Sequence, residues 1–111
     1  MLHRMNLQPE PFEKIRSGQK TIELRLYDEK RRLITVGDCI EFYCDGETLL
    51  AGVIGLHHFA SFAELYDHLP LLQCGYTAET VPSASPRDME SYYSPEQQVK
   101  YGVLGIKLKL L

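Results

Sequence analysis

The fold of this chain is decided by the stretch Ser17-Gly18-Gln19-Lys20-Thr21-Ile22-Glu23-Leu24-Arg25-Leu26-Tyr27-Asp28. Glycine favours the left-handed conformation that ends a helix, so Gly18 predicts the end of a helix over residues 9–17. From residue 21 to residue 27 polar and apolar side chains alternate, which is the pattern of a strand with two different faces. The polar face carries a hydroxyl, a carboxylate, a guanidinium and a phenol, from Thr21, Glu23, Arg25 and Tyr27. We therefore expect that face to meet water or a polar ligand.

A β-hairpin is predicted in the middle of the chain. Residues 39–44 alternate as a strand, and Asp45-Gly46 is a strong signal for a tight type I′ turn. The returning strand is expected over residues 48–58. Its two glycines, Gly52 and Gly55, predict a bend or bulge of the kind that curved sheets use.

The second half of the chain predicts short helices and a closing strand. Ser61 opens a helix that runs to about residue 69, and Ser85-Pro86 and Ser94-Pro95 each place serine at a cap and proline at the first helical position. Residues 103–111 alternate as a last strand. We expect so few curved strands to close into a barrel, because closure removes the exposed edges of the sheet. We expect an α+β fold, with a small barrel of five or six mostly antiparallel strands and flanking short helices.

The size and charge of the chain restrict its function. Its 111 residues predict one domain over residues 1–111. A net charge of −3 argues against a general electrostatic surface for nucleic acid, so any such site must be a local basic patch. The three cysteines predict free thiols in a reducing cytoplasm. Residues 1–8 lack a long apolar run and no other run is long enough to cross a membrane, so we expect no signal peptide and no membrane partner.

The polar strand and its neighbours carry a motif. Gly18, Lys20, Glu23 and Arg25 form the pattern G-x-K-x-x-E-x-R, which resembles the signature of the ASCH (activating signal cointegrator homology) domain in the PUA-like superfamily. The stretch from Gly37 to Phe42 resembles that family's G-D-x-I-x-F strand, and residues 102–106 resemble its closing strand. The resemblance covers nearly the whole chain in the same order. It implies a PUA-like barrel with a cleft between barrel and helices, lined by the signature.

The resemblance also implies two functions. ASCH domains are thought to bind RNA or other nucleic acid, so it predicts RNA or a nucleoside-like ligand as the partner. Some small bacterial relatives resemble an amidohydrolase that deacylates N4-acetylcytidine by means of a lysine, a threonine and a distant glutamate. This chain keeps the lysine as Lys20 but has Glu23 in the place of the threonine. As an enzyme it would use Lys20, Glu23 and a distant carboxylate, for which Glu79 ranks before Glu90.

The chemistry of the motif fits a ligand site, with an ion pair as the alternative. Lys20 stands before the strand and can reach a phosphate or a base carbonyl. Glu23 and Arg25 share one strand face with Cα atoms roughly 6.5–7 Å apart. Arginine suits a phosphate or a guanine edge, and glutamate accepts from an exocyclic amine. The same residues can instead form a surface ion pair worth about 0–1 kcal/mol.

Other side chains extend the predicted site. Thr21 and Tyr27 share the polar face, and Tyr101 precedes the closing strand near the expected cleft. Tyr27 can stack on a base or cap the rim of the barrel, and most of the tyrosines can equally serve as core residues with a wet hydroxyl. A basic rim is predicted from the cations that flank the signature: Lys14, Arg16, Lys30, Arg31 and Arg32.

Cofactor and metal chemistry have no support in the sequence. No C-x-x-C or H-E-x-x-H spacing occurs, and His57 and His58 point to opposite faces of a strand. No glycine-rich phosphate loop occurs either, so we predict neither a metal nor a cofactor. A third functional class stays open: an interaction module whose barrel face docks a partner protein.

Overall fold

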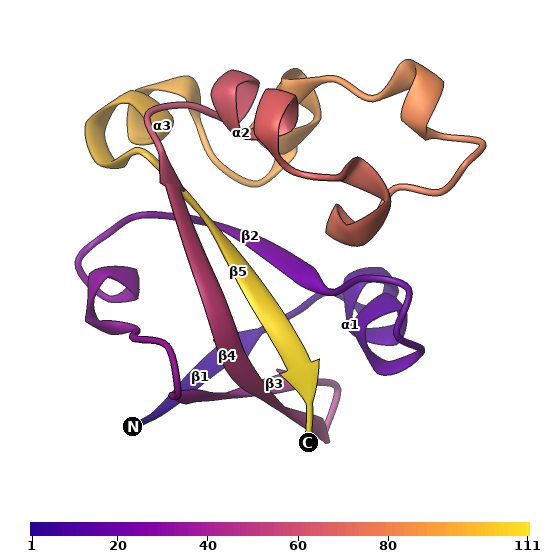
Figure 1. Ribbon diagram of the computed structural model, residues 1–111, viewed down its shortest axis with the longest axis vertical. Helices are drawn as coiled ribbons and strands as arrows, with labels where there is room; N and C mark the ends of the chain where they lie inside the picture. Colours follow the sequence, from indigo (N-terminus) through magenta and orange to yellow (C-terminus); the bar gives the residue numbers. More distant parts are fainter.

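The fold of residues 1–111 is described by a computed structural model and is α+β (Figure 1). Its strands are β1 (Leu2–Asn6), β2 (Ile22–Leu26), β3 (Cys39–Cys44), β4 (Glu47–Phe59) and β5 (Val103–Leu110). Its α-helices are α1 (Pro9–Arg16), α2 (Phe62–His68) and α3 (Pro95–Tyr101). Four 3₁₀ helices cover Arg31–Leu33, Leu71–Cys74, Val81–Ser83 and Pro86–Ser91. No helix is long and apolar enough to cross a membrane.

The five strands form one curled sheet in the order β1-β3-β4-β5-β2. Only β1 and β3 run parallel, and the other three pairings are antiparallel. The prediction of about five or six mostly antiparallel strands is confirmed. Because β1 and β2 are the two edges, the sheet is a half-barrel with one open side. The segment between β4 and β5 lies across one end of it, and α1 lies beside the open side (Figure 1).

The residues predicted to form turns, the bulge and the helix caps do so. Asp45 and Gly46 take positive φ angles of 47° and 83°, and they join β3 to β4 in a two-residue turn. The register of β4 against β5 shifts between Val53 and Gly55, which is the predicted irregularity. Ser85 and Ser94 both close capping boxes with proline in the first turn.

One strand, β1, has no counterpart among the elements located from the sequence. Only His3 and Met5 of β1 point into the core. Because one of these two residues is a polar histidine, the sequence of β1 lacks the alternation of apolar and polar residues that predicts a strand. His3 is tolerated there because its Nε2 lies 2.8 Å from the Asp38 carboxylate, which also accepts from the N-terminal amine at 3.1 Å. This strand is held by pairing with a distant segment and by a buried polar contact, and neither leaves a local pattern.

Two apolar clusters hold the sheet and its helices. The larger fills the half-barrel and includes Phe12 and Ile15 of α1 with Ile40, Phe42 and Ile106 of the sheet. The smaller lies on the opposite side of β2 and β5, where Ile22, Leu24 and Leu26 meet Phe62 and Leu65 of α2 together with Cys74 and Met89. The apolar face of β2 is therefore covered, and its polar face turns to the open side of the half-barrel.

Candidate functional site

Three charged side chains of the motif meet at the open side of the half-barrel. Lys20 Nζ lies 2.9 Å from Glu23 Oε1, and Arg25 Nε donates to Glu23 Oε2 at 2.9 Å. Strand β2 begins at Ile22, so Lys20 stands before it and is free of the alternation, as the sequence predicts. We call Lys20, Glu23 and Arg25 the charged triad.

The triad is buried, whereas the ion pair that the sequence offers as the alternative to a ligand site is a surface pair. The exposed fraction of the Glu23 side chain is 4%, and that of each cation is 12%. Burial opposes ionisation of Glu23, but the charges and hydrogen bonds of Lys20 and Arg25 outweigh it, so the pKa of Glu23 lies below its ordinary value. A carboxylate at this depth is kept only because cations engage both of its oxygens.

Arg25 also joins the two edges of the sheet. Its Nη2 donates to the backbone carbonyl of Asn6 at 2.8 Å, while its Nε holds Glu23 on its own strand. Asn6 belongs to β1 and Arg25 to β2, and these two strands are not hydrogen-bonded to each other through their backbones. The guanidinium therefore spans the open side of the half-barrel and fixes the triad at that opening.

The corner that carries Lys20 is held by contacts from α1 and from residues 73–75. The Lys20 amide donates to the Lys14 carbonyl at 2.9 Å, and the Thr21 amide donates to the Gln73 carbonyl at 2.9 Å. Gly75 has a φ of +110°, and a Cβ there would lie 3.2 Å from Lys20 Cδ. A glycine at 75 thus leaves room for the lysine stem, which ends beside Glu23.

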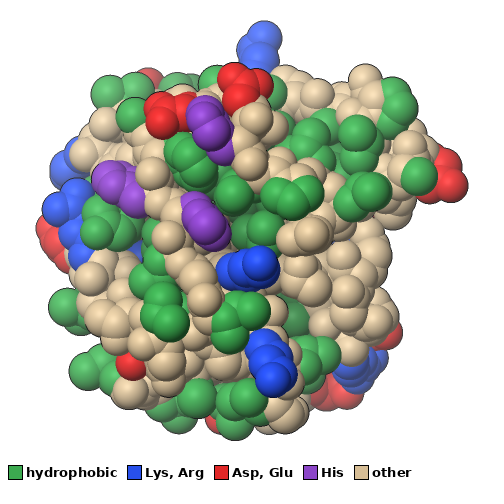
Figure 2. Space-filling view, in the orientation of Figure 1, with side chains coloured by type: hydrophobic (Ala, Val, Ile, Leu, Met, Phe, Trp, Pro, Cys, Tyr) green, Lys and Arg blue, Asp and Glu red, His purple; other side chains and the backbone are tan.

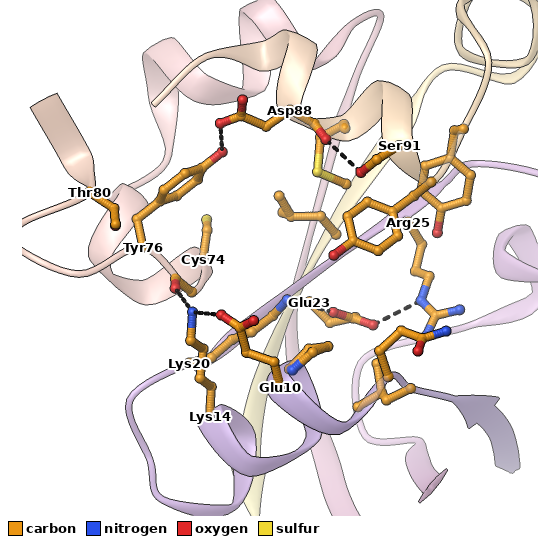
Figure 3. A pocket seen from close by; sticks show the side chains of 18 of the residues that line it. Glu10, Lys14, Lys20, Glu23, Arg25, Cys74, Tyr76, Thr80, Asp88 and Ser91 are labelled. Carbon is orange, nitrogen blue, oxygen red and sulfur yellow. Dashed lines mark hydrogen bonds and ion pairs between the residues drawn. The ribbon is translucent and has the colours of Figure 1, made fainter. Parts of the chain in front are cut away.

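A cavity of about 560 Å³ opens above the triad. Figure 3 shows Glu23 between its two cations, Lys14 and Glu10 of α1 on one side, and Tyr76 and Asp88 across the cavity. Lys14 Nζ is bound to Glu10 at 2.9 Å and donates to the Gly75 carbonyl at 2.8 Å. The volume is within the range of small-molecule sites, about 300–1,000 Å³.

Four tyrosines form the wall opposite α1: Tyr66, Tyr76, Tyr92 and Tyr93. The Tyr76 hydroxyl donates to Asp88 Oδ2 at 2.7 Å, so it accepts from the Tyr66 hydroxyl, which lies 2.7 Å away. Burial, followed by the hydrogen bonds to Tyr66 and Asp88, raises the pKa of Tyr76. Burial also raises the pKa of Tyr93, against the lowering effect of Arg25. Both hydroxyls therefore stay protonated near neutral pH.

Comparison with known proteins assigns the family. The model of the ASCH domain matches residues 5–111. The chain belongs to the ASCH domain family. The crystal structure of hypothetical protein PH0355 is 34% identical, with full coverage of both chains and a TM-score of 0.84. The solution structure of protein PF0455 from Pyrococcus furiosus is also 34% identical, covers 100% of this chain and 98% of its own, and has a TM-score of 0.77.

More distant similarity extends to the fold alone. The crystal structure of ASCH from Zymomonas mobilis is 17% identical, and the alignment covers 97% of this chain and 66% of that one with a TM-score of 0.67. No curated protein matches the chain. The PUA-like fold that the motif implies is thus confirmed, and the motif of this ASCH domain lies at the opening of the half-barrel.

Four of the predicted site residues lie outside the cavity of this ASCH domain. Thr21 stabilises the fold through backbone hydrogen bonds, and its carbonyl accepts from the Leu108 amide at 2.8 Å. Tyr27 stacks on His58 with ring centroids 4.0 Å apart, and Tyr101 packs against the smaller apolar cluster. Glu79 is exposed and does not line the cavity. The structure therefore does not bring Thr21, Tyr27, Tyr101 or Glu79 together with the triad.

The predicted basic rim is mostly dispersed. Only Lys14 of that set lines the cavity. Arg16 pairs with Glu13 and Glu47, and Arg31 pairs with Asp28. The face of β4 and β5 seen in Figure 2 carries separate lysine and histidine side chains and no continuous basic surface. No group of three or more histidine, cysteine, aspartate or glutamate side chains is placed to hold a metal ion.

Asp88 and the tyrosine wall are cavity residues that sequence reasoning missed. Five of the seven tyrosines fall within residues 66–101, and that concentration is the only signal for them in the sequence. Their segment is built from short helices and turns without a strand, so no period of two or 3.6 residues tells which rings face the cavity.

Proposed function

We propose that this ASCH domain binds the base of an RNA nucleotide, or of a free nucleoside-like ligand, in the cavity above the charged triad. The observation that carries the proposal is the pairing of a buried charged floor with a wall of tyrosines in one recess of about 560 Å³. Aromatic side chains stack on bases, and charged groups at the floor supply hydrogen bonds to base edges or to the backbone.

The charges around the cavity favour one nucleotide over a long stretch of backbone. Three cations line the cavity, Lys14, Lys20 and Arg25, and three acids accompany them, Glu10, Glu23 and Asp88. These charges cancel, and the whole chain carries −3. A protein that held many phosphates would need a surplus of cations along a groove. Recognition in this domain is therefore local, through a single base that leaves its stack and enters the cavity.

Replacement of Tyr92 by alanine should weaken binding by about 5- to 150-fold, because stacking on one base contributes about 1–3 kcal/mol. Tyr92 lines the cavity and is 58% exposed, so its loss should change the free energy of unfolding little. Fluorescence anisotropy with short single-stranded RNA and calorimetry with nucleosides measure the effect. Tyr43→Ala is the matched control, since Tyr43 is 36% exposed and lies outside the cavity. Equal affinities for the two variants would refute base stacking in the cavity.

An amidohydrolase acting on N4-acylated cytidine is the alternative that the family resemblance implies. In this chain Glu23 fills the position of the threonine, and both of its oxygens are bound to cations. Glu79, the first-ranked distant carboxylate, lies outside the cavity. We therefore expect the purified protein to release no acetate from N4-acetylcytidine above the rate of a protein-free blank. Release that depends on Lys20 would replace the binding proposal with the enzymatic one.

A further inference from the structure

The floor of the cavity has more unused hydrogen-bond donors than acceptors. A lysine ammonium has three N–H donors, and Lys20 spends one on Glu23. A guanidinium has five, and Arg25 spends one on Glu23 and one on the Asn6 carbonyl, which leaves Nη1 without a partner. Glu23 is the one acceptor in the triad, and each of its oxygens already holds a cation. A ligand group that meets this floor is therefore best an acceptor.

The three side chains of the floor carry one net positive charge, and the nearby acid Asp28 is paired with Arg31 at 3.1 Å. Two cations share the single carboxylate of Glu23. The other cation of the cavity, Lys14, is matched by Glu10 at 2.9 Å. Asp88 accepts from the Tyr76 hydroxyl and from the Ser85 amide on the opposite wall, and it is exposed to water, which screens its charge.

An anionic oxygen group both accepts the free hydrogen bonds of the floor and balances its positive charge. A neutral carbonyl only accepts the hydrogen bonds. Charged donors on oxyanions make shorter and stronger hydrogen bonds than on neutral acceptors, and arginine binds phosphate and carboxylate oxygens in pairs. An anion at this depth also balances the surplus charge, which is costly to leave unpaired once a ligand has excluded water. Lys20 and Arg25 lie on the two sides of Glu23, so an oxyanion above the carboxylate can receive donors from both (Figure 3).

We propose that the charged floor is an oxyanion receptor, and that the ligand of this cavity is a nucleotide whose phosphate contacts Lys20 and Arg25 while its base lies against the tyrosine wall. The choice of a nucleotide rests on the proposed function. The preference of the floor for an oxyanion does not rest on the proposed function, because a planar carboxylate would bind to the same donors. Glu23 is then a positioning residue that holds the two cations apart and limits their charge.

Isothermal titration at low salt with cytidine, cytidine 5′-monophosphate, inorganic phosphate and benzoate tests the proposal. We expect the monophosphate to bind at least about tenfold more tightly than cytidine, and we expect added sodium chloride to narrow that difference. Lys20→Gln removes the surplus charge and leaves the Arg25–Glu23 contact in place, so the preference for the monophosphate should disappear. Lys107→Gln is the matched control, because Lys107 is exposed on β5, outside the cavity, and has no ion pair.

The four ligands separate this proposal from the proposed function. If cytidine binds as tightly as its monophosphate, the oxyanion receptor is wrong and the base site stands. If benzoate and phosphate bind while both cytidine compounds do not, the base site is wrong and the oxyanion receptor stands. Binding of none of the four contradicts both. Loss of the preference in Lys107→Gln as well as in Lys20→Gln would assign it to general charge and overturn the receptor. The ratio of the two cytidine affinities is measured on the unmodified chain, so it does not depend on the folding of a variant.

Discussion

Replacement of Glu23 by alanine is expected to lower the free energy of unfolding by about 3–5 kcal/mol, because it leaves two buried cations without their shared carboxylate. The Glu23 side chain is 4% exposed and lies 2.9 Å from each cation. The loss is large because water cannot replace the missing partner at this depth. Urea denaturation followed by circular dichroism gives the change, with the slope of the transition as a check that the variant unfolds in one step.

Glu41→Ala is the control for this prediction. Glu41 receives a hydrogen bond from Arg4 at 2.8 Å, but the two side chains are 30% and 60% exposed. An exposed ion pair contributes about 0–1 kcal/mol, so the control should cost no more than that. Equal losses in the two variants would mean that the triad behaves as a surface ion pair, and the claim that burial gives it its energetic weight would then fail.

Replacement of Phe42 by alanine is expected to cost about 3–5 kcal/mol through lost burial and the cavity that it leaves. Phe42 is 0% exposed and belongs to the larger apolar cluster inside the half-barrel. That cluster supports the concave side of the sheet from which β2 presents Glu23 and Arg25. Thermal and urea unfolding of the variant measure the cost.

Tyr43→Ala is the control for this prediction, because Tyr43 lies on the opposite face of β3 from Phe42. It follows Phe42 on β3, points outward, and makes a cation–π contact with Arg4, whose guanidinium lies 4.7 Å from the ring centroid. Such a contact contributes about 0.5–1 kcal/mol at an exposed site, so Tyr43→Ala should be mild. A loss in Tyr43→Ala as great as in Phe42→Ala would contradict the assignment of faces on β3.

The parts of the fold that sequence predicts are those fixed by local rules. Gly18 has a φ of 85° just after α1, which is why a glycine there marks the change from helix to strand. The alternation from residue 21 to residue 27 becomes β2, one face of which packs on the smaller cluster. The end of the helix is predicted by the conformational preference of glycine, and the strand by the alternation of its side chains.

The parts that sequence does not predict depend on distant partners. Strand β1 exists because it pairs with β3 in parallel, and nothing in residues 2–6 alone shows that pairing. The burial of the triad depends on the segment around Gly75 and Tyr76 lying over Lys20, which no spacing near Lys20 records. For the same reason Thr21 and Tyr27 share the strand face of Glu23 in sequence but are held outside the cavity.

The most direct test of the central claim is an amide NMR titration of the protein with cytidine 5′-monophosphate. The claim is that the buried triad and the tyrosine wall form one ligand site. It predicts that the largest shifts fall in three separate stretches, residues 20–25, 74–76 and 88–93, which only the folded cavity brings together. Shifts confined to the outer face of β3 and β4, or the absence of any saturable shift, would contradict it.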